Sequence, residues 1–326
     1  MSRRPPPPPT EPGPRPLIIA GHTVPSGTRA RFELPVARLQ TDVDVALPVV
    51  VLHGARPGPR IWVNAALHGD ELNGVEVIRR LLVELDPLTL AGAVLAVPIV
   101  NVFGFLNQSR YLPDRRDLNR SFPGSPRGSL AARLAHLFTT EIVGPCSHGI
   151  DLHTGSDGRT NLPQIRADLD DEETQRIACA FGAPVALQAR LRDGSLRSIA
   201  RDRGAKVLLY EAGETMRFDE GAIRAGFEGV LRVMATLGML ESAPLPGGAT
   251  LLARRSEWGR APRSGLFHAH VALGATCQRG DELGFVTTPY GAEKTPVRAR
   301  QDGVVIGLAT NPHVFQGDAI VHIAAR

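Results

Sequence analysis

Three short, β-rich stretches of this 326-residue chain each end in a side chain that can bind a metal ion. His68 and Glu71 stand in the sequence ALHGDE, His153 stands in DLHTG, and Glu211 stands in LLYEAG. In open α/β sheets the carboxyl ends of parallel strands meet at one edge, and ligands bind there. The three strand ends therefore favour an α/β fold in which these side chains converge on one site.

The first of these segments changes from strand to helix within a few residues. Residues 60–67 read RIWVNAAL, an apolar run rich in β-formers, and the run stops at His68-Gly69-Asp70. From residue 71 to 85 the apolar positions recur at helical spacing. We therefore predict a strand over 60–67 and a helix over 71–85, with His68 and Glu71 on either side of the turn between them.

Two imidazoles and a carboxylate are ligands typical of a hydrolytic zinc site. A catalytic Zn²⁺ takes three protein ligands and leaves its fourth position to water, whose pKa falls to about 7. We expect His68, Glu71 and His153 to bind the metal and Glu211 to act as a base. Because the chain has 10 His and 33 acidic residues, any one pair of these is weak evidence. The prediction depends on the whole set.

The remainder of the chain divides at a change of pattern. The first part of the chain has the alternating strands and helices typical of an α/β fold. Strand-like runs occur at 28–39, 46–54 and 93–100, and helical runs at 129–143, 171–181 and 222–237. After ESAPLPGG at 241–248 the sequence becomes short strands cut by glycine, with two similar Gly-Asp turns that suggest an internal repeat. We predict a proline-rich disordered arm over 1–16, an α/β domain over 17–243 and a small all-β barrel or sandwich over 249–326.

Composition narrows the class of protein. The net charge of +4 comes from scattered arginines, with only two lysines, so nucleic-acid binding is not expected. The three cysteines form no CxxC pair, which indicates a reducing compartment. No apolar run reaches the roughly 20 residues that a membrane span needs, and the amino terminus has no secretory h-region. We expect a cytoplasmic protein without membrane contact; a homo-oligomer is compatible with this composition.

A second group of residues lies in the segment NVFGFLNQSRYLPDRRDLNRSFPG, over 101–124, after the predicted strand at 93–100. It is rich in arginine and asparagine, and the planar guanidinium of arginine matches carboxylate oxygens. A substrate with a carboxylate is therefore indicated. Among these side chains we favour Arg110, Asn119 and Arg120 for a functional role and interpret Arg115 and Arg116, together with the later Arg127, as solvated loop charges.

The motifs HGDE, RDLNRSFPG, DLHTG and YEAGE, in this order, resemble the succinylglutamate desuccinylase and aspartoacylase family, a branch of the zinc carboxypeptidase superfamily. The resemblance covers roughly residues 47–240, and the glycine-rich tail is similar to the carboxy-terminal β domain of that family. It implies a mixed-sheet, carboxypeptidase-like catalytic domain. It also implies a zinc-dependent hydrolase that cleaves the linear amide bond of a small N-acyl amino acid, such as an N-acetylated diamino acid.

The resemblance also implies roles for single residues. His68, Glu71 and His153 would be the zinc ligands, and Glu211 the catalytic carboxylate that carries a proton from water to the leaving amine. Asn119 and Arg120 would hold the substrate carboxylate.

Two further roles have alternatives. Arg110 is similar to the arginine that polarises the scissile carbonyl, but its spacing from the Asn-Arg pair is longer than in aspartoacylases, so Arg115 or Arg116 could take this role. Asp117 resembles an acid that orients a metal-bound imidazole, and Asp151 is the alternative.

Other functions fit parts of the sequence. A zinc carboxypeptidase that acts on peptides would use the same groups in an open groove, and a binding protein could keep the metal fold without turnover. A lipoyl or biotinyl carrier would need a lysine at a hairpin tip flanked by Met, which Lys294 in AEKTP lacks. His268 and His270 share one strand face, where packing or exposure is the expected account.

Overall fold

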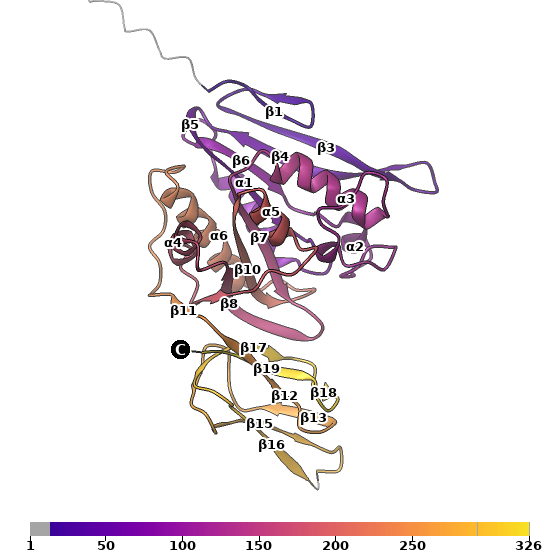
Figure 1. The fold of residues 1–326 in the computed structure, drawn as a ribbon, viewed down its shortest axis with the longest axis vertical. Coiled ribbons are helices and arrows are strands. Elements are labelled where there is room, and N and C mark those ends of the chain that lie inside the picture. The colour runs from indigo at the N-terminus through magenta and orange to yellow at the C-terminus, as the bar shows by residue number, and fades with distance from the viewer. Residues whose placement is uncertain (1–13, 292, 326) are drawn as a thin grey trace, which may run out of the picture.

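The computed structural model describes residues 14–291 and 293–325. Most of the predicted proline-rich arm, residues 1–13, lies outside the described residues. Figure 1 shows a large α/β part, followed at the carboxyl end by a smaller part made of strands. Among the described residues, no helix has the length and apolar character that a membrane crossing requires. The cytoplasmic location stays a prediction.

The centre of the molecule is a mixed sheet, as predicted. Its strand order begins with β12 (Ser256–Arg260), β19 (Ala319–Ala325) and β17 (Gly303–Ala309) and continues through β8, β10, β7, β5, β6, β4 and β3. Four neighbouring strands of this path are parallel: β10 (Lys206–Glu214), β7 (His148–Gly155), β5 (Arg56–Ala65) and β6 (Ala91–Val97). Antiparallel strands flank them: β8 (Arg159–Ala167) on one side, β4 (Asp44–His53) and β3 (Thr28–Arg38) on the other. A separate pair, β1 (Leu17–Ile19) and β2 (His22–Val24), forms its own small sheet.

Helices cover both faces of this sheet, which explains why the parallel strands are continuously apolar. Along β5, Ile61 and Val63 belong to one hydrophobic core and Trp62 to the other. The first core is completed by α1 (Asn73–Glu84), α4 (Glu172–Phe181) and α6 (Glu220–Thr236). The second is completed by α3 (Leu130–Phe138) and α5 (Leu196–Asp202). The short helix α2 (Val102–Leu106) follows β6.

Element boundaries differ from the predictions where turns intervene. The predicted helix over 71–85 begins only at Asn73, because Glu71 belongs to a turn in which its N–H donates to the carbonyl of His68 at 3.2 Å. The helix predicted over 129–143 is α3 followed by a π-helical turn, η2 (Thr139–Val143). Several elements had no sequence prediction, among them β8, β9 (Val185–Gln188) and α5.

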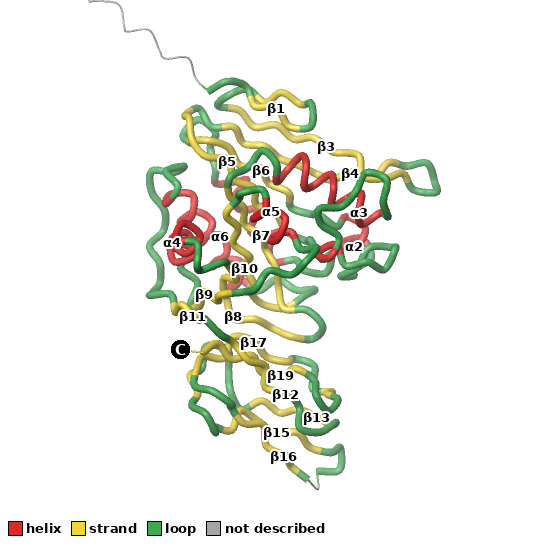
Figure 2. Tube along the Cα trace, in the orientation of Figure 1, coloured by secondary structure: helices red, strands yellow, loops and turns green. Residues whose placement is uncertain are grey.

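The carboxyl-terminal part is all-β, as predicted, and forms two packed sheets (Figure 2). One contains β12 (Ser256–Arg260), β14 (Thr276–Cys277), β17 (Gly303–Ala309) and β19 (Ala319–Ala325). The other contains β13 (Gly265–Ala269), β15 (Glu282–Thr287), β16 (Lys294–Arg298) and β18 (His313–Val314). The buried side chains of Phe267, Leu283 and Ile320 lie between them.

This part is not separate from the central sheet. Strand β17 pairs with β8 of the α/β part, and β11 (Leu251–Ala253) pairs with β9. The two parts therefore share backbone hydrogen bonds, and the division into domains over 17–243 and 249–326 stays a proposal. The two Gly-Asp turns have the same geometry: Gly280 and Gly317 have positive φ, and Asp281 and Asp318 each accept a backbone N–H three residues earlier at 2.8 Å.

Candidate active site

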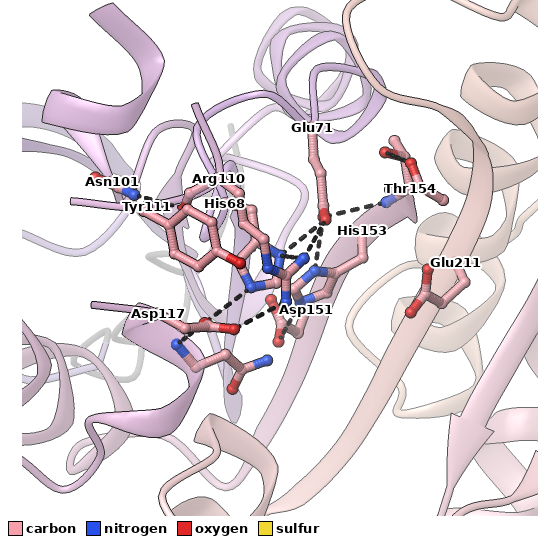
Figure 3. A network of polar contacts seen from close by, with 12 residues as sticks. His68, Glu71, Asn101, Arg110, Tyr111, Asp117, Asp151, His153, Thr154 and Glu211 are labelled. Carbon is pink, nitrogen blue, oxygen red and sulfur yellow. Dashed lines mark hydrogen bonds and ion pairs between the residues drawn. The ribbon is translucent and has the colours of Figure 1, made fainter. Parts of the chain in front are cut away.

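The structure brings His68, Glu71 and His153 together at the carboxyl edge of the parallel strands (Figure 3). One donor atom from each lies within 4.8 Å of the others, and all three side chains are buried. Nδ1 of His68 is 2.8 Å from one carboxylate oxygen of Glu71, and Nδ1 of His153 is 2.7 Å from the other. The three predicted metal-capable residues thus form one cluster.

Glycine makes the turn that carries the first two of these residues. A side chain at Gly69 would place its Cβ 1.9 Å from the carbonyl carbon of Gly104 at the neighbouring helix α2. Just before this turn Ala66 adopts a positive φ of 47°, which ends the extended run of β5. The HGDE motif therefore needs its glycine for close backbone packing.

The other two predicted residues come from neighbouring parallel strands. His153 lies on β7 and Glu211 on β10, and the two residues are paired in register. The residues that precede them, Leu152 and Tyr210, point to the other face of the sheet, into the hydrophobic core with α1, α4 and α6. This alternation places the His153 and Glu211 side chains on the same face of the sheet.

A carboxylate lies close to the Nε2 atom of each of the two histidines, on the side of the ring away from Glu71. Nε2 of His68 is 3.2 Å from Asp117, and Nε2 of His153 is 2.8 Å from Asp151. Asp151 is fully buried and also accepts a hydrogen bond from Asn64 at 2.6 Å. The sequence offered Asp117 and Asp151 as alternatives for one position, whereas the structure has both, on different histidines.

The charges of the cluster shift its ionisation strongly. Burial disfavours the charged imidazolium of His153, but the carboxylates of Asp151 and Glu71 outweigh burial and raise its pKa well above the ordinary value. The same balance raises the pKa of His68, where Glu71 and Asp117 act. Burial also opposes ionisation of Glu71, yet the two histidines lower the pKa of this carboxyl. The cluster therefore requires cationic charge beside a buried carboxylate.

A divalent metal ion fits this donor set. With an ion bound, Asp117 and Asp151 would favour a proton on each Nε2 and leave the Nδ1 lone pairs to the ion, whose charge would replace that of the imidazolium rings beside Glu71. Two imidazole nitrogens and a carboxylate oxygen are ligands that Zn²⁺ prefers. The fit rests on His68, Glu71 and His153 alone.

The guanidinium of Arg110 lies against this cluster. Its nitrogens are 3.2 Å from Nδ1 of His68, 3.5 Å from Glu71 and 2.9 Å from Asp117. Burial disfavours its charge, but these two carboxylates outweigh burial and raise its pKa. The alternatives Arg115 and Arg116 are exposed. Of the three arginines, Arg110 is the one in contact with the predicted ligands.

Asn119 and Arg120 lie in the short 3₁₀ turn η1 (Leu118–Arg120), next to Asp117. The side-chain oxygen of Asn119 accepts a hydrogen bond from the backbone N–H of Leu196 at 2.9 Å, so it already has a structural partner. Arg120 is exposed, and burial of part of its side chain lowers its pKa. One nitrogen of the Arg120 guanidinium donates to the backbone carbonyl of Asn119, and its exposed side chain can still meet a ligand, while the Asn119 side chain ties the loop to α5.

Glu211 lies on the other side of His153 from Arg110, with its carboxylate turned toward the cluster (Figure 3). Its side chain is 14% exposed. One oxygen accepts a hydrogen bond from the amide of Asn161 at 2.9 Å, and the other is 3.7 Å from the guanidinium of Arg166. Glu214 points elsewhere and accepts a hydrogen bond from Thr310.

Sequence reasoning missed two polar residues beside Glu211 and a third, Arg197, close to Arg166 and Asp151. Asn161 and Arg166 lie on the unpredicted strand β8, and Arg197 lies on the unpredicted helix α5. Arg197 is buried and donates to two backbone carbonyls, with no carboxylate in hydrogen-bond contact; burial and the charge of Arg166 lower its pKa to about 10. Arg197 is the second residue of a short helix, and nothing in the sequence around it distinguished it from the other arginines.

Two other groups weighed in the sequence lie away from the cluster. His268 and His270 are exposed on β13 and its end, where they contact the ring of Phe285. Lys294 begins β16, with its amine 4.7 Å from the centre of the same ring.

A family model matches residues 57–237 of this chain; its description is the succinylglutamate desuccinylase/aspartoacylase catalytic domain. The chain is also 29% identical, over 294 residues, to N-alpha-acetyl-L-2,4-diaminobutyric acid deacetylase from Halomonas elongata. The aligned region covers 86% of each protein. The matched segment contains His68, Glu71, His153 and Glu211.

Solved structures have the same architecture. A succinylglutamate desuccinylase/aspartoacylase from Rhodobacter sphaeroides superimposes with a TM-score of 0.82 at 28% identity, over 90% of this chain and 95% of that one. The product-bound ectoine utilization protein EutE (DoeB) from Ruegeria pomeroyi gives a TM-score of 0.81 at 24% identity, over 92% and 95% of the two chains. At the lower identity the likeness concerns the fold alone.

Proposed function

Because this chain belongs to the succinylglutamate desuccinylase/aspartoacylase family, we propose that it cleaves the linear amide bond of a small N-acyl amino acid. The proposed site of the reaction is the His68–Glu71–His153 cluster, and the proposed cofactor is zinc. The observation that carries the proposal is the convergence of these three buried side chains on one point, with Glu211 beside them. Hydrolysis of an amide needs an activated water and a proton carrier, and the cluster supplies groups suited to both.

The proposed metal site uses Nδ1 of each histidine and the carboxylate of Glu71. A zinc ion bound there would lower the pKa of its water to about 7 and polarise a carbonyl oxygen. Asp117 and Asp151 would keep the two imidazoles in the orientation and tautomer that leave Nδ1 free. These outer carboxylates support zinc as the cofactor because each is already in contact with a ligand ring.

Glu211 is proposed as the general base and acid of the reaction. It would accept a proton as the water oxygen bonds to the amide carbon, and deliver that proton to the nitrogen as the carbon–nitrogen bond breaks. The products are a free carboxylic acid and a free amine. Arg110 is proposed to stabilise the negative charge that develops on the carbonyl oxygen, since its guanidinium already lies beside the cluster.

The carboxylate of the substrate is proposed to lie on the arginine side of the site. Arg120 is exposed in the loop after Asp117. The side-chain NH₂ group of Asn119 beside it has no hydrogen-bond partner among the described residues. On the Glu211 side, Arg166 and its neighbour Arg197 add two guanidiniums that have no carboxylate in hydrogen-bond contact among the described residues. Arginines at both ends of the cluster favour a substrate with at least one anionic group.

The relative from Halomonas elongata makes N-acetyl-2,4-diaminobutyrate the first substrate to test. The decisive experiment measures zinc content and then assays amide hydrolysis on a panel of N-acetyl-2,4-diaminobutyrate, N-acylaspartate, N-succinylglutamate and short peptides. Activity should disappear when a chelator removes the metal and return with added Zn²⁺. Preference for peptides would replace the proposal with a carboxypeptidase, and hydrolysis that persists without metal would overturn it.

A further inference from the structure

The carboxylate of Glu211 has an unusual neighbour, the side-chain amide of Asn161. The Asn161 residue is only 6% exposed, and its side-chain NH₂ group donates a hydrogen bond to one Glu211 oxygen at 2.9 Å. A carboxylate on a strand end can rotate about its side-chain bonds, and a single directed donor restricts it to one orientation. Asn161 is therefore positioned to decide where Glu211 points.

The strand that carries Asn161 is held by the carboxyl-terminal β part. Asn161 lies on β8 opposite Gly307 of β17, and Ala309 of β17 lies opposite Arg159. Further along β8, the amide of Gln164 donates to the carbonyl of Ile306 at 3.0 Å. The β part thus extends the catalytic sheet along the strand that contacts Glu211.

A close contact transmits the position of β17 to the Asn161 side chain. A Cβ atom at Gly307 would lie 3.1 Å from the side-chain oxygen of Asn161 and 3.2 Å from the Cβ of His322. Glycine at this position leaves room for the Asn161 amide to turn its nitrogen toward Glu211. Strands β8 and β17 therefore fit closely together at Asn161 and Gly307, the pair next to Glu211.

We propose that Asn161 is a positioning residue for Glu211, and that the carboxyl-terminal β part acts in catalysis by setting Asn161 through Gly307. This inference rests on the proposed role of Glu211 as the proton carrier. It assigns the β part a function in the reaction itself, in addition to any restriction of access to the site.

The first test replaces Asn161 by residues of similar size. Asn161→Leu removes the donor, and Asn161→Asp places a second carboxylate beside Glu211. We expect kcat to fall on the order of tenfold to a hundredfold in the leucine variant, and further in the aspartate variant, because a hydrogen bond to a charged group is lost. KM should change by less than about twofold, since Asn161 is not proposed to touch substrate.

The pH profile separates positioning from general damage to the fold. Removing a donor from the ionised carboxylate disfavours that form, so the acidic limb of kcat/KM should move to higher pH in both variants. Thr310→Val is the matched control, because it breaks another contact between the two parts, at 2.8 Å, that ends on Glu214 instead of Glu211. Its kcat and pH profile should stay those of the unmodified enzyme.

The second test concerns Gly307. Gly307→Ala should lower kcat severalfold while zinc content stays unchanged, because the added methyl group crowds the Asn161 amide. Gly259→Ala makes the same chemical change in β12, where the nearest heavy atom is at an ordinary 3.4 Å, and should leave kcat unchanged. Equal effects of the two alanines would refute the link through Gly307.

A crystal structure of the zinc-loaded Asn161→Leu variant gives a readout that needs no substrate. The inference requires the Glu211 side chain to leave its present orientation or to occupy several. An unmoved carboxylate, or a kcat within twofold of the unmodified enzyme, would overturn it. Absence of amide hydrolysis in the unmodified enzyme would instead count against the proposed function, and the crystal structure would still decide the role of Asn161.

Discussion

At the scale of single residues, the two histidines of the cluster are held by carboxylates of different burial. Asp151 is fully buried behind His153, whereas the Asp117 side chain behind His68 is 16% exposed and also contacts Arg110. Burial opposes ionisation of Asp117, but His68 and Arg110 outweigh it and lower the pKa of this carboxyl. Asp117 therefore links the metal ligands to the arginine proposed to polarise the substrate.

Replacement of Asp117 tests this link. Asp117→Asn should weaken zinc binding by about 10–100-fold, because the amide no longer accepts a charge-assisted hydrogen bond from the imidazole of His68. Competition with a chromophoric chelator measures the affinity. Asp202→Asn, at an exposed position on α5, is the control and should bind zinc as the unmodified protein does. Equal affinities for all three proteins would rule out the orienting role of Asp117.

Replacement of Glu211 tests the proton carrier. Glu211→Gln keeps the size of the side chain, and Glu211 is not one of the three proposed metal ligands. Zinc content should therefore stay at the level of the unmodified enzyme. Turnover should fall by about 10²–10⁴-fold, the usual contribution of a general base. Glu214→Gln is the matched control three residues away and should retain activity. Comparable turnover in the Glu211 variant would remove this residue from the mechanism.

At the scale of elements, the loop between β6 and α3 is attached to helix α5 by Asn119. The N–H groups of the first turn of a helix have no partner within the helix, and Asn119 satisfies one of them at Leu196. This contact brings the segment that carries Arg120 next to the start of the helix that carries Arg197, although the two come from distant parts of the sequence. The asparagine of the RDLNRSFPG motif thus has a structural task as well as the proposed one in binding.

Two substitutions separate these tasks. Asn119→Ala removes the acceptor and should destabilise the protein by about 1–3 kcal/mol, measured as a lower thermal midpoint. Asn119→Asp keeps an acceptor for Leu196, so its thermal midpoint should stay close to that of the unmodified protein. The aspartate should nevertheless raise KM for a carboxylate substrate by charge repulsion. An unchanged KM in Asn119→Asp would leave Asn119 with the structural task alone.

At the scale of the whole molecule, His322 of β19 lies where the β part meets the central sheet. It is buried, stacks on Trp258 with ring centres 4.3 Å apart and contacts Ser256 at 2.9 Å. Burial, with the charge of Arg166, lowers its pKa from 6.5 to about 3. The folded protein thus holds this imidazole neutral at pH values where an unfolded chain would protonate it.

This shift predicts a pH dependence of stability. The stabilising contribution is complete above pH 6.5 and is lost as the pH falls toward 3, by up to about 1.4 kcal/mol per pH unit. His322→Gln should therefore lose less stability than the unmodified protein between pH 6.5 and 4, as measured by thermal midpoints at each pH. His313→Gln, at an exposed position of the β part, should follow the unmodified protein. Parallel curves for His322→Gln and the unmodified protein would contradict the shift.

Much of the architecture was predictable because its signals are local. The apolar run of β5 and the helical spacing after Glu71 lie within about 25 residues, so they identified a strand, a turn and a helix without knowledge of the fold. The boundaries were less predictable: α1 begins two residues later than its periodicity indicates, because the turn that presents Glu71 uses the first of those residues. Strand β8 had no prediction, since its half-buried and buried residues do not alternate regularly.

The residues that could bind a metal, their order, and their positions at or just after the ends of buried strands can all be read from the amino-acid sequence. Three features emerge only from the folded chain: Asp117 and Asp151 serve different histidines, Arg110 rather than Arg115 or Arg116 lies at the cluster, and β17 continues the catalytic sheet beside β8. The reason is physical. Spacing and turn chemistry act between neighbours in the chain, whereas these contacts join segments far apart in sequence, whose register depends on how the whole sheet assembles.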